Sequence, residues 1–281
     1  MARGDRTERG AALRESDTVM PLELFFDLVF VLAITQTTAL MADQPTWTGI
    51  AKGMLVLAVM WWAWVGYSWL TSVVDPEAGV VRLAIAAAIA GLLICAICIP
   101  DVFGDDGLLF AGAYLLVRVM QLVLFMHAAV DDPHLRRSII GLAVGTLTGT
   151  GLLVAASFTD GALQATLWAI AVVADFGGAI AADASGWTLR PHHFAERHGL
   201  IIIIALGESL VAIGASASEE ALTTPVVAAA VLGSLLAFAA WWLYFDVVAL
   251  VATRRLVEAE PGLSQNKLAR DSYSYGHLPM V

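Results

Sequence analysis

Ionisable side chains lie inside apolar stretches that are long enough to cross a bilayer. Glu208 stands near the middle of the apolar stretch 199–216, and Arg118 is embedded in the stretch 108–130. An acid or a base at the centre of a membrane-spanning helix costs about 2.5–3.5 kcal/mol on insertion scales, so such a residue is a candidate for function. A buried carboxylate needs a cation, a proton or water beside it. These residue types indicate an internal ion pair or a pathway for protons or cations.

The balance of embedded charge bears on the choice between these two interpretations. Arg118 and Glu208 are each about midway along their helices, so they are expected at similar depth and could form an ion pair. A structural pair that fixes the register of two helices is one interpretation. Asp27, Asp175 and Asp246 add further acids, however, and Arg118 is the one embedded base that faces them. This surplus of acid favours a bound proton or monovalent cation.

Several polar residues share a helix face with these groups. At 100° per residue, Glu23 and Asp27 fall on one face of the first apolar stretch, and Gln36 lies on another. Gln121 lies on the same face as Arg118. The candidate residues of the pathway or internal charge network are Glu23, Asp27, Gln36, Arg118, Gln121, Asp175, Arg197, Glu208 and Asp246.

Other residues that often carry chemistry do not form a recognisable site. Ser209 has no histidine at helical spacing to activate it, so the sequence argues against a hydrolase and, with no other nucleophile–base pair, against an enzyme. His192, His193 and His198 lack a cysteine or a pair of acids that would complete a metal site. We interpret them as a basic cluster at the membrane interface, and we expect neither a metal nor another cofactor.

The composition is that of a polytopic membrane protein. Of the 281 residues, 59% are hydrophobic and 14% are charged, which is too apolar for a soluble domain. The net charge of −10 argues against a nucleic-acid partner, so the expected surroundings are a lipid bilayer. We predict an all-α transmembrane bundle of about eight spans, because apolar runs of about 20 residues can each cross the hydrocarbon core. The runs are 22–42, 50–71, 80–99, 108–130, 138–158, 162–182, 199–216 and 225–248.

The basic residues predict the orientation of these spans. Arginines gather in the N-terminal tail, in alternate connections and in the C-terminal region, whereas the opposite loops hold only Lys52. Both termini should therefore be cytoplasmic. We expect residues 1–20 to form a cytoplasmic tail and residues 21–252 the transmembrane domain. Residues 253–281 should form a cytoplasmic segment and the start of a truncated ninth helix.

A stripe of small residues occupies one face of the fifth span. Gly141, Gly145 and Gly149 follow one another at four-residue spacing, a pattern that lets another helix approach closely. The partner helix belongs either to this chain or to a second copy in a homo-oligomer.

Two stretches resemble the bacterial low temperature requirement A family of membrane proteins. Residues 21–36 (PLELFFDLVFVLAITQ) are similar to the family's ELFFDLVFVFAI-x-Q opening. Residues 193–200 (HFAERHGL) and 205–209 (ALGES) are similar to its HF-x-ER-x-GL and ALGES signatures. The resemblance implies a multi-pass protein of the bacterial inner membrane linked to growth in the cold, and it implies no established substrate. Members usually continue with several more spans.

A second, more remote resemblance concerns the first span. Residues 25–35 (FFDLVFVLAIT) are similar to the FSDxVFAIAIT first helix of potassium channels of lysosomes and bacteria, in which Asp27 and Thr35 would take motif positions. We therefore predict a channel or transporter for a cation or proton, with Glu208 and Asp27 important and Arg118 as internal counter-charge. The alternative is a non-transporting structural or sensory membrane protein linked to growth at low temperature.

Overall fold

The computed structural model describes residues 17–182, 184–219 and 221–281, and the predicted tail therefore lies almost wholly outside the described residues. Helices make up most of this part of the chain, which contains no strand. Eight helical segments within it are long and apolar enough to cross a membrane, which confirms the prediction of an all-α membrane bundle. They are α1 (Pro21–Asp43), α2 (Trp47–Val73), α3 (Gly79–Cys98), α4 (Gly107–Ala128), α5 (Pro133–Ala156), α6 (Gly161–Ala181), α7 (Pro191–Glu219) and α8 (Thr224–Leu243), the last continuing as a helix to Glu258.

Local sequence signals explain where these helices begin. Pro21, Pro133 and Pro191 each occupy the first position of a helix, where the missing backbone N–H costs nothing. Asp132 caps α5, because its Oδ1 accepts hydrogen bonds from the N–H groups of His134 and Leu135 at 2.9 and 3.0 Å. These starts fix which residues of each span face the interior.

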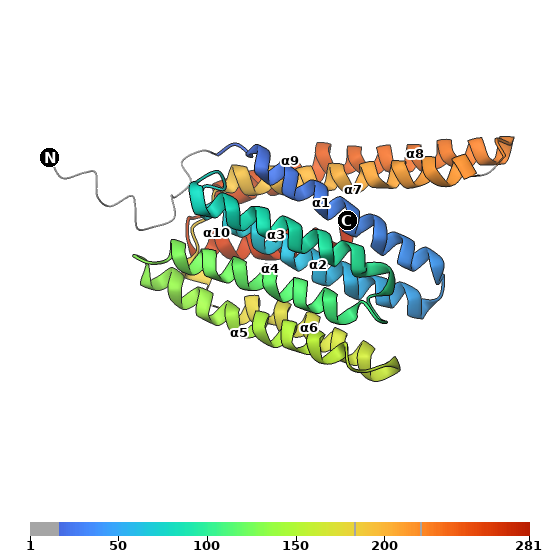
Figure 1. Ribbon diagram of the computed structural model, residues 1–281. Coiled ribbons are helices and arrows are strands. Elements are labelled where there is room, and N and C mark those ends of the chain that lie inside the picture. Colours follow the sequence, from blue (N-terminus) through green and yellow to red (C-terminus); the bar gives the residue numbers. More distant parts are fainter. Residues whose placement is uncertain (1–16, 183, 220) are drawn as a thin grey trace.

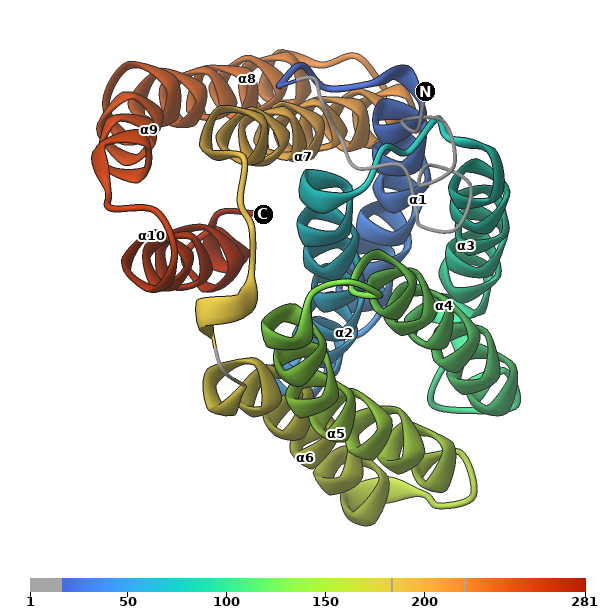
Figure 2. The same cartoon turned by 90° about the vertical axis from the view of Figure 1, so that its left-hand side faces the viewer.

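The helices run side by side along a common direction, with α2 near the centre (Figures 1 and 2). Helix α2 packs against α1, α4, α6 and α7. Its aromatic side chains Trp61, Trp64 and Tyr67 are fully buried. This central helix therefore contributes residues to both polar clusters described below.

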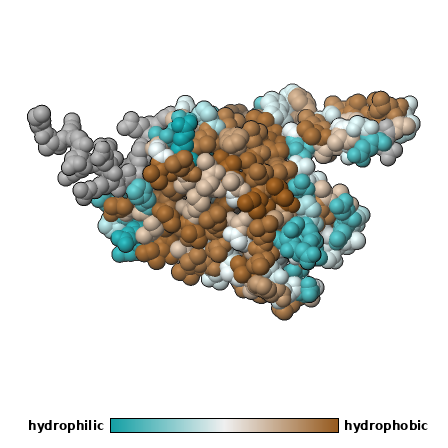
Figure 3. Space-filling view, viewed as in Figure 1, coloured by the Kyte–Doolittle hydropathy of each residue, from teal (hydrophilic) through white to brown (hydrophobic). Residues whose placement is uncertain are grey.

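The outer surface of the bundle is apolar. Large hydrophobic side chains such as Leu83, Val144 and Ile180 are exposed on its outside. Figure 3 shows apolar surface over the middle of the molecule, with hydrophilic residues gathered toward its ends. Because such a surface is unfavourable in water, these faces are suited to contact the acyl chains of a bilayer.

The C-terminal region returns to the bundle. After α9 (Ala249–Glu258), the chain forms α10 (Leu263–Leu268) and a π-helical segment, Ala269–Tyr275. Residues 253–281 are the segment for which we predict a cytoplasmic stretch and the start of a helix. Within it Tyr273 and Ser274 are buried, and the Trp61 indole donates a hydrogen bond to the Ser274 carbonyl at 2.7 Å. The segment thus forms part of the core, because aromatic residues of α2 and α7 offer it an apolar surface.

The glycine stripe of α5 faces α6 of the same chain. A Cβ atom on Gly145 would lie 2.7 Å from the Ala174 carbonyl oxygen, and one on Gly149 would lie 2.9 Å from that of Ala171. Gly141 faces Ala182. Only glycine lets the two backbones approach this closely, so the stripe is occupied by a helix of the chain itself.

Candidate functional site

The first polar cluster lies between the starts of α1 and α7, which run parallel. The Arg197 guanidinium donates to Glu23 Oε1 at 3.0 Å and to Asp27 Oδ1 at 2.6 Å. His193 Nε2 lies 2.8 Å from Glu23 Oε1, and the Trp64 indole donates to Asp27 Oδ1 at 2.8 Å. Glu23, Asp27, His193 and Arg197 are each at most 1% exposed. We call these four ionisable residues the α1–α7 cluster.

The α1–α7 cluster contains two acids, one arginine and one histidine. Glu23 and Asp27 supply two negative charges, and Arg197 supplies one positive charge. His193 Nδ1 lies 3.3 Å from the Ser72 hydroxyl, which is also 3.1 Å from the Ser68 carbonyl oxygen. When the single Ser72 proton points to that carbonyl, the Ser72 oxygen can accept a hydrogen bond from His193 Nδ1.

Two of the three histidines of α7 correct our interpretation of an interfacial basic cluster, whereas His192 is exposed. His193 and His198 are fully buried. His198 Nδ1 donates to the Phe194 carbonyl at 2.9 Å, and its ring packs edge-on against Trp64 and Tyr273. The sequence pattern was misread because α7 begins eight residues before the apolar stretch, so its polar first turns are covered by α1 and α2.

His277, in the C-terminal segment, packs against the His198 ring. Burial lowers the pKa of His277 to about 4, so its imidazole is neutral at pH 7. Nδ1 donates to the Ser272 carbonyl at 3.0 Å, and Nε2 accepts from the Tyr244 hydroxyl at 2.8 Å. This contact fastens the C-terminal segment to the π-helical turn after α8, Tyr244–Val248.

The second polar cluster is centred on Arg118 and joins four helices. The guanidinium donates to Asp175 Oδ1 at 2.9 Å, to the Thr146 hydroxyl at 2.8 Å and to the Trp62 carbonyl at 3.1 Å. Thr146 donates to Asp175 Oδ1 at 2.9 Å, and the Tyr114 hydroxyl lies 3.3 Å from Asp175 Oδ2. Helices α2, α4, α5 and α6 are thereby linked through one buried ion pair.

This arrangement corrects the pairing of Arg118 with Glu208 that we considered from their depths. Glu208 lies on the α1 side of α7, where the Thr35 hydroxyl donates to Glu208 Oε1 at 2.6 Å. Within the described ranges, no basic side chain forms an ion pair with Glu208. Its side chain is close to fully buried, with the residue 9% exposed. Arg118 instead forms an ion pair with Asp175, because α6 and not α7 packs near α4 and α5.

An apolar layer separates Glu208 from the α1–α7 cluster. Asp27 and Thr35 are eight residues apart on α1, a rise of about 12 Å. Between them lie the buried side chains Phe30 and Ile34, and Ile201 of α7 is buried in the same core. No polar residue of this layer bridges the two sites in the part of the chain that the structure describes.

The remaining predicted residues divide by position. Gln121 is 1% exposed and lies near Arg118 on α4, beside a cavity. Gln36 is half-buried on α1, and Asp246 is exposed in the π-helical turn after α8, outside both clusters. Among the described residues, no three histidine, cysteine or carboxylate side chains converge to hold a metal ion.

Sequence reasoning missed His193, Tyr114 and Thr146 as members of the two clusters. One signal was available for His193, because it precedes Arg197 by four residues, as Glu23 precedes Asp27. Two pairs with this spacing present matching faces of two helices. The roles of Tyr114 and Thr146 depend on which helices are neighbours, and no local pattern reports that.

Comparison with known proteins finds one matching family and a curated relative. Residues 18–281 match the family described as "Bacterial low temperature requirement A protein". An uncharacterized protein of Rhizobium meliloti (strain 1021) is 28% identical over 269 residues, covering 92% of this chain and 65% of that protein. The chain therefore spans slightly less than two thirds of the length of this curated relative. No solved structure matches the chain.

Proposed function

The chain belongs to the bacterial low temperature requirement A family, and from that premise we propose that it is a channel or transporter for protons or monovalent cations. We place it in the bacterial inner membrane. In this proposal Glu208 binds the transported ion or proton. Arg118 and Arg197 are fixed internal counter-charges.

The environment of Glu208 carries the proposal. The other buried acids, Asp27, Asp175 and Glu23, each have an arginine partner, whereas Glu208 has the hydroxyl of Thr35. A carboxyl group in apolar surroundings without a cationic partner takes up a proton or binds a cation. Glu208 is therefore the described acid best suited to exchange an ion.

The Thr35 hydroxyl fits both protonation states of Glu208. This hydroxyl lies 2.6 Å from Glu208 Oε1 and 3.1 Å from the Val31 carbonyl oxygen, and it has only one hydrogen. It can donate to a charged Glu208. It can also donate to Val31 while it accepts a hydrogen bond from a protonated Glu208. The contact thus persists through a cycle of proton binding and release.

The apolar layer of Phe30, Ile34 and Ile201 supports a gated rather than an open path. Hydrophobic constrictions block ions by excluding water, so an ion at Glu208 would reach the α1–α7 cluster only when the two helices separate. In this proposal the contact between α1 and α7 contains two polar sites, the α1–α7 cluster and Glu208, and the apolar layer is the barrier between them.

Reconstituted vesicles test this proposal. We expect wild-type protein to carry a proton, potassium or sodium flux, measured with a pH-sensitive dye or ion-selective electrodes under an imposed gradient. Glu208→Gln, which keeps the shape but removes the charge, should reduce the flux to that of protein-free vesicles. Thr35→Val should reduce it partly, because it removes the hydroxyl and retains the side-chain volume.

The matched control is Glu219→Gln, which makes the same change at an exposed position of the same helix. It should leave the flux unchanged. If the wild type carries none of the three ions, or if Glu208→Gln transports like the wild type, the proposal is refuted.

A second candidate is a non-transporting structural or sensory membrane protein. The observation that favours it is the closure of the Arg118 cluster, in which one ion pair holds four helices together. Absence of flux from a correctly folded wild-type protein would select this candidate.

A further inference from the structure

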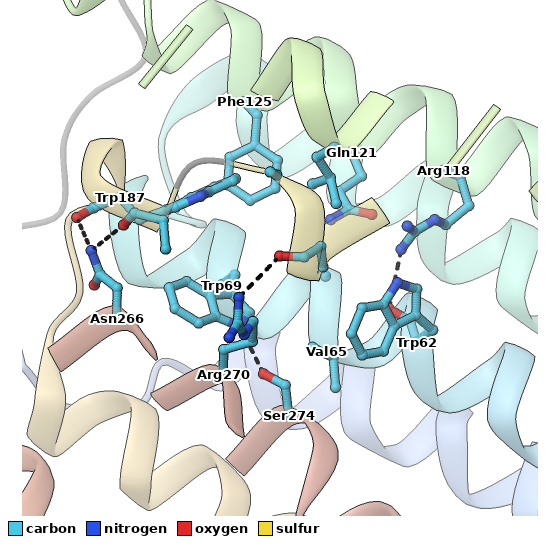
Figure 4. A pocket seen from close by; sticks show the side chains of 15 residues that line it. Trp62, Val65, Trp69, Arg118, Gln121, Phe125, Trp187, Asn266, Arg270 and Ser274 are labelled. Atoms are coloured by element: carbon cyan, nitrogen blue, oxygen red, sulfur yellow. Dashed lines mark hydrogen bonds between the residues drawn. The ribbon is translucent and has the colours of Figure 1, made fainter. Parts of the chain in front are cut away.

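A cavity of about 60 Å³ lies between α2, α4 and the C-terminal segment. Its walls are mainly apolar and include four aromatic side chains, which are Trp62 and Trp69 from α2, Phe125 from α4, and Trp187 from the connection before α7 (Figure 4). The view shows Arg118 at one end of this space and Asn266 at the other. The cavity therefore extends along the bundle axis, beside the second polar cluster.

Three buried polar atoms in the residues that line the cavity have no hydrogen-bond partner among the residues that the structure describes. They are Arg118 Nε, Gln121 Oε1 and Asn266 Oδ1. Each of these residues is 1% exposed. Asn266 Nδ2 donates to the carbonyl oxygens of Ala184 and Trp187, both at 2.8 Å, so the orientation of its amide is fixed and the oxygen is the unpaired atom. A buried polar atom without a partner costs about 1–3 kcal/mol.

The unpaired set consists of one donor, Arg118 Nε–H, and two acceptors, Gln121 Oε1 and Asn266 Oδ1. A molecule that satisfies both kinds of atom must donate and accept hydrogen bonds. A water molecule needs a cavity of at least about 10–15 Å³, so a cavity of about 60 Å³ has room for several waters. Water therefore matches the polar atoms and the volume.

We propose that this cavity is an internal hydration site whose waters bridge Arg118, Gln121 and Asn266 and exchange with solvent beside Arg270. The proposal does not depend on transport. It gives the Arg118–Asp175 pair access to water from one end of the bundle, the end at which α10 begins.

Arg270 lines the cavity between Asn266 and Arg118 (Figure 4). Its side chain is 15% exposed, and its Nε donates at 2.8 Å to Asp271, whose side chain is 60% exposed. Its Nη1 lies 3.4 Å from the Ala179 carbonyl oxygen. The guanidinium is thus held between the Ala179 carbonyl and an exposed carboxylate, and this is where we place the exchange of the waters with solvent.

The test uses the reaction of silver ions with single cysteines, since Ag⁺ is small and reacts with thiols only where water carries it. The background is Cys95→Ala with Cys98→Ala. Ala179→Cys places a thiol in the cavity, and Ile180→Cys is the matched control on the next residue of α6, where the side chain is 60% exposed on the outer face. Thiols that remain are counted by mass spectrometry after denaturation and maleimide labelling.

We expect Ag⁺ to modify Ala179→Cys at least about tenfold faster than Ile180→Cys, because a charged ion is excluded from acyl chains but not from a hydrated cavity. With vesicles of both orientations, the fast reaction should occur from the side of Asp271 only. Arg270→Ala should accelerate it and Arg270→Lys should not. If Ala179→Cys does not fold, Ala182→Cys replaces it. Equal rates at positions 179 and 180, or no reaction at 179, would overturn the proposal.

Discussion

Arg118 and Arg197 each hold at least one carboxylate at hydrogen-bond distance inside the bundle, and their different surroundings give them different roles. Arg197 lies at the interface of two parallel helices with two acids and a histidine, so its cluster joins α1 to α7 through several contacts. Arg118 has one acid, a hydroxyl and a backbone carbonyl around it. Its cluster is suited to fixing helix positions.

Removal of one charge from the Arg118–Asp175 pair should be worse than removal of both. We expect Arg118→Gln to lower the free energy of unfolding by about 3–5 kcal/mol, because Asp175 is then a buried charge without a cation. Arg118→Gln combined with Asp175→Asn should recover at least half of that loss. Unfolding by sodium dodecyl sulfate in mixed micelles, followed by tryptophan fluorescence, measures both. A double variant no more stable than Arg118→Gln would contradict this view of the pair.

At the scale of the helices, the contact between α5 and α6 depends on backbone approach rather than on side-chain burial. Gly145 should therefore not tolerate a methyl group, which would meet the Ala174 carbonyl at 2.7 Å. We expect Gly145→Ala to lower the free energy of unfolding by about 1–3 kcal/mol through overpacking. The same mixed-micelle titration measures it.

Gly151 offers the matched control on the same helix, because a Cβ atom there meets nothing within 4 Å. Gly151→Ala should be neutral or should stabilise α5 by about 0.5–1 kcal/mol, since alanine restricts the unfolded chain. Equal destabilisation by both substitutions would show that the effect is not one of helix contact.

Most helices could be predicted from the apolar runs, and the exceptions have a physical cause. The first run, 22–42, differs from α1 (Pro21–Asp43) by one residue at each end. The seventh run, 199–216, omits the first two turns of α7, which begins at Pro191. A hydropathy scale scores His193 and Arg197 as residues exposed to water. In the structure both are buried, and they contact the acids of α1. The partner of Arg118 could not be predicted either, because the depth of a residue along its helix does not say which helices are adjacent.

At the scale of the whole molecule, the bundle has two chemically different ends. The starts of α1, α3, α5 and α7 lie together at one end, as Figure 1 shows. Arginines occupy the first turns of helices at that end, including Arg82 of α3 and Arg136 and Arg137 of α5. Among the described residues, the basic residue at the other end is Lys52, near the start of α2. Arg197 no longer counts toward this asymmetry because it is buried. The remaining bias still predicts that the arginine-rich end is cytoplasmic.

This orientation can be tested with two cysteines that differ only in the end of the bundle they occupy. In the background without Cys95 and Cys98, Asp131→Cys lies in the exposed turn before α5 and Asp160→Cys in the exposed turn before α6. We expect a membrane-impermeant maleimide added to intact cells to label Asp160→Cys and to label Asp131→Cys only after the cells are opened. The reverse pattern would place the arginine-rich end outside. The α1–α7 cluster would then face the extracytoplasmic solution, and the direction in which an ion reaches Glu208 would be inverted.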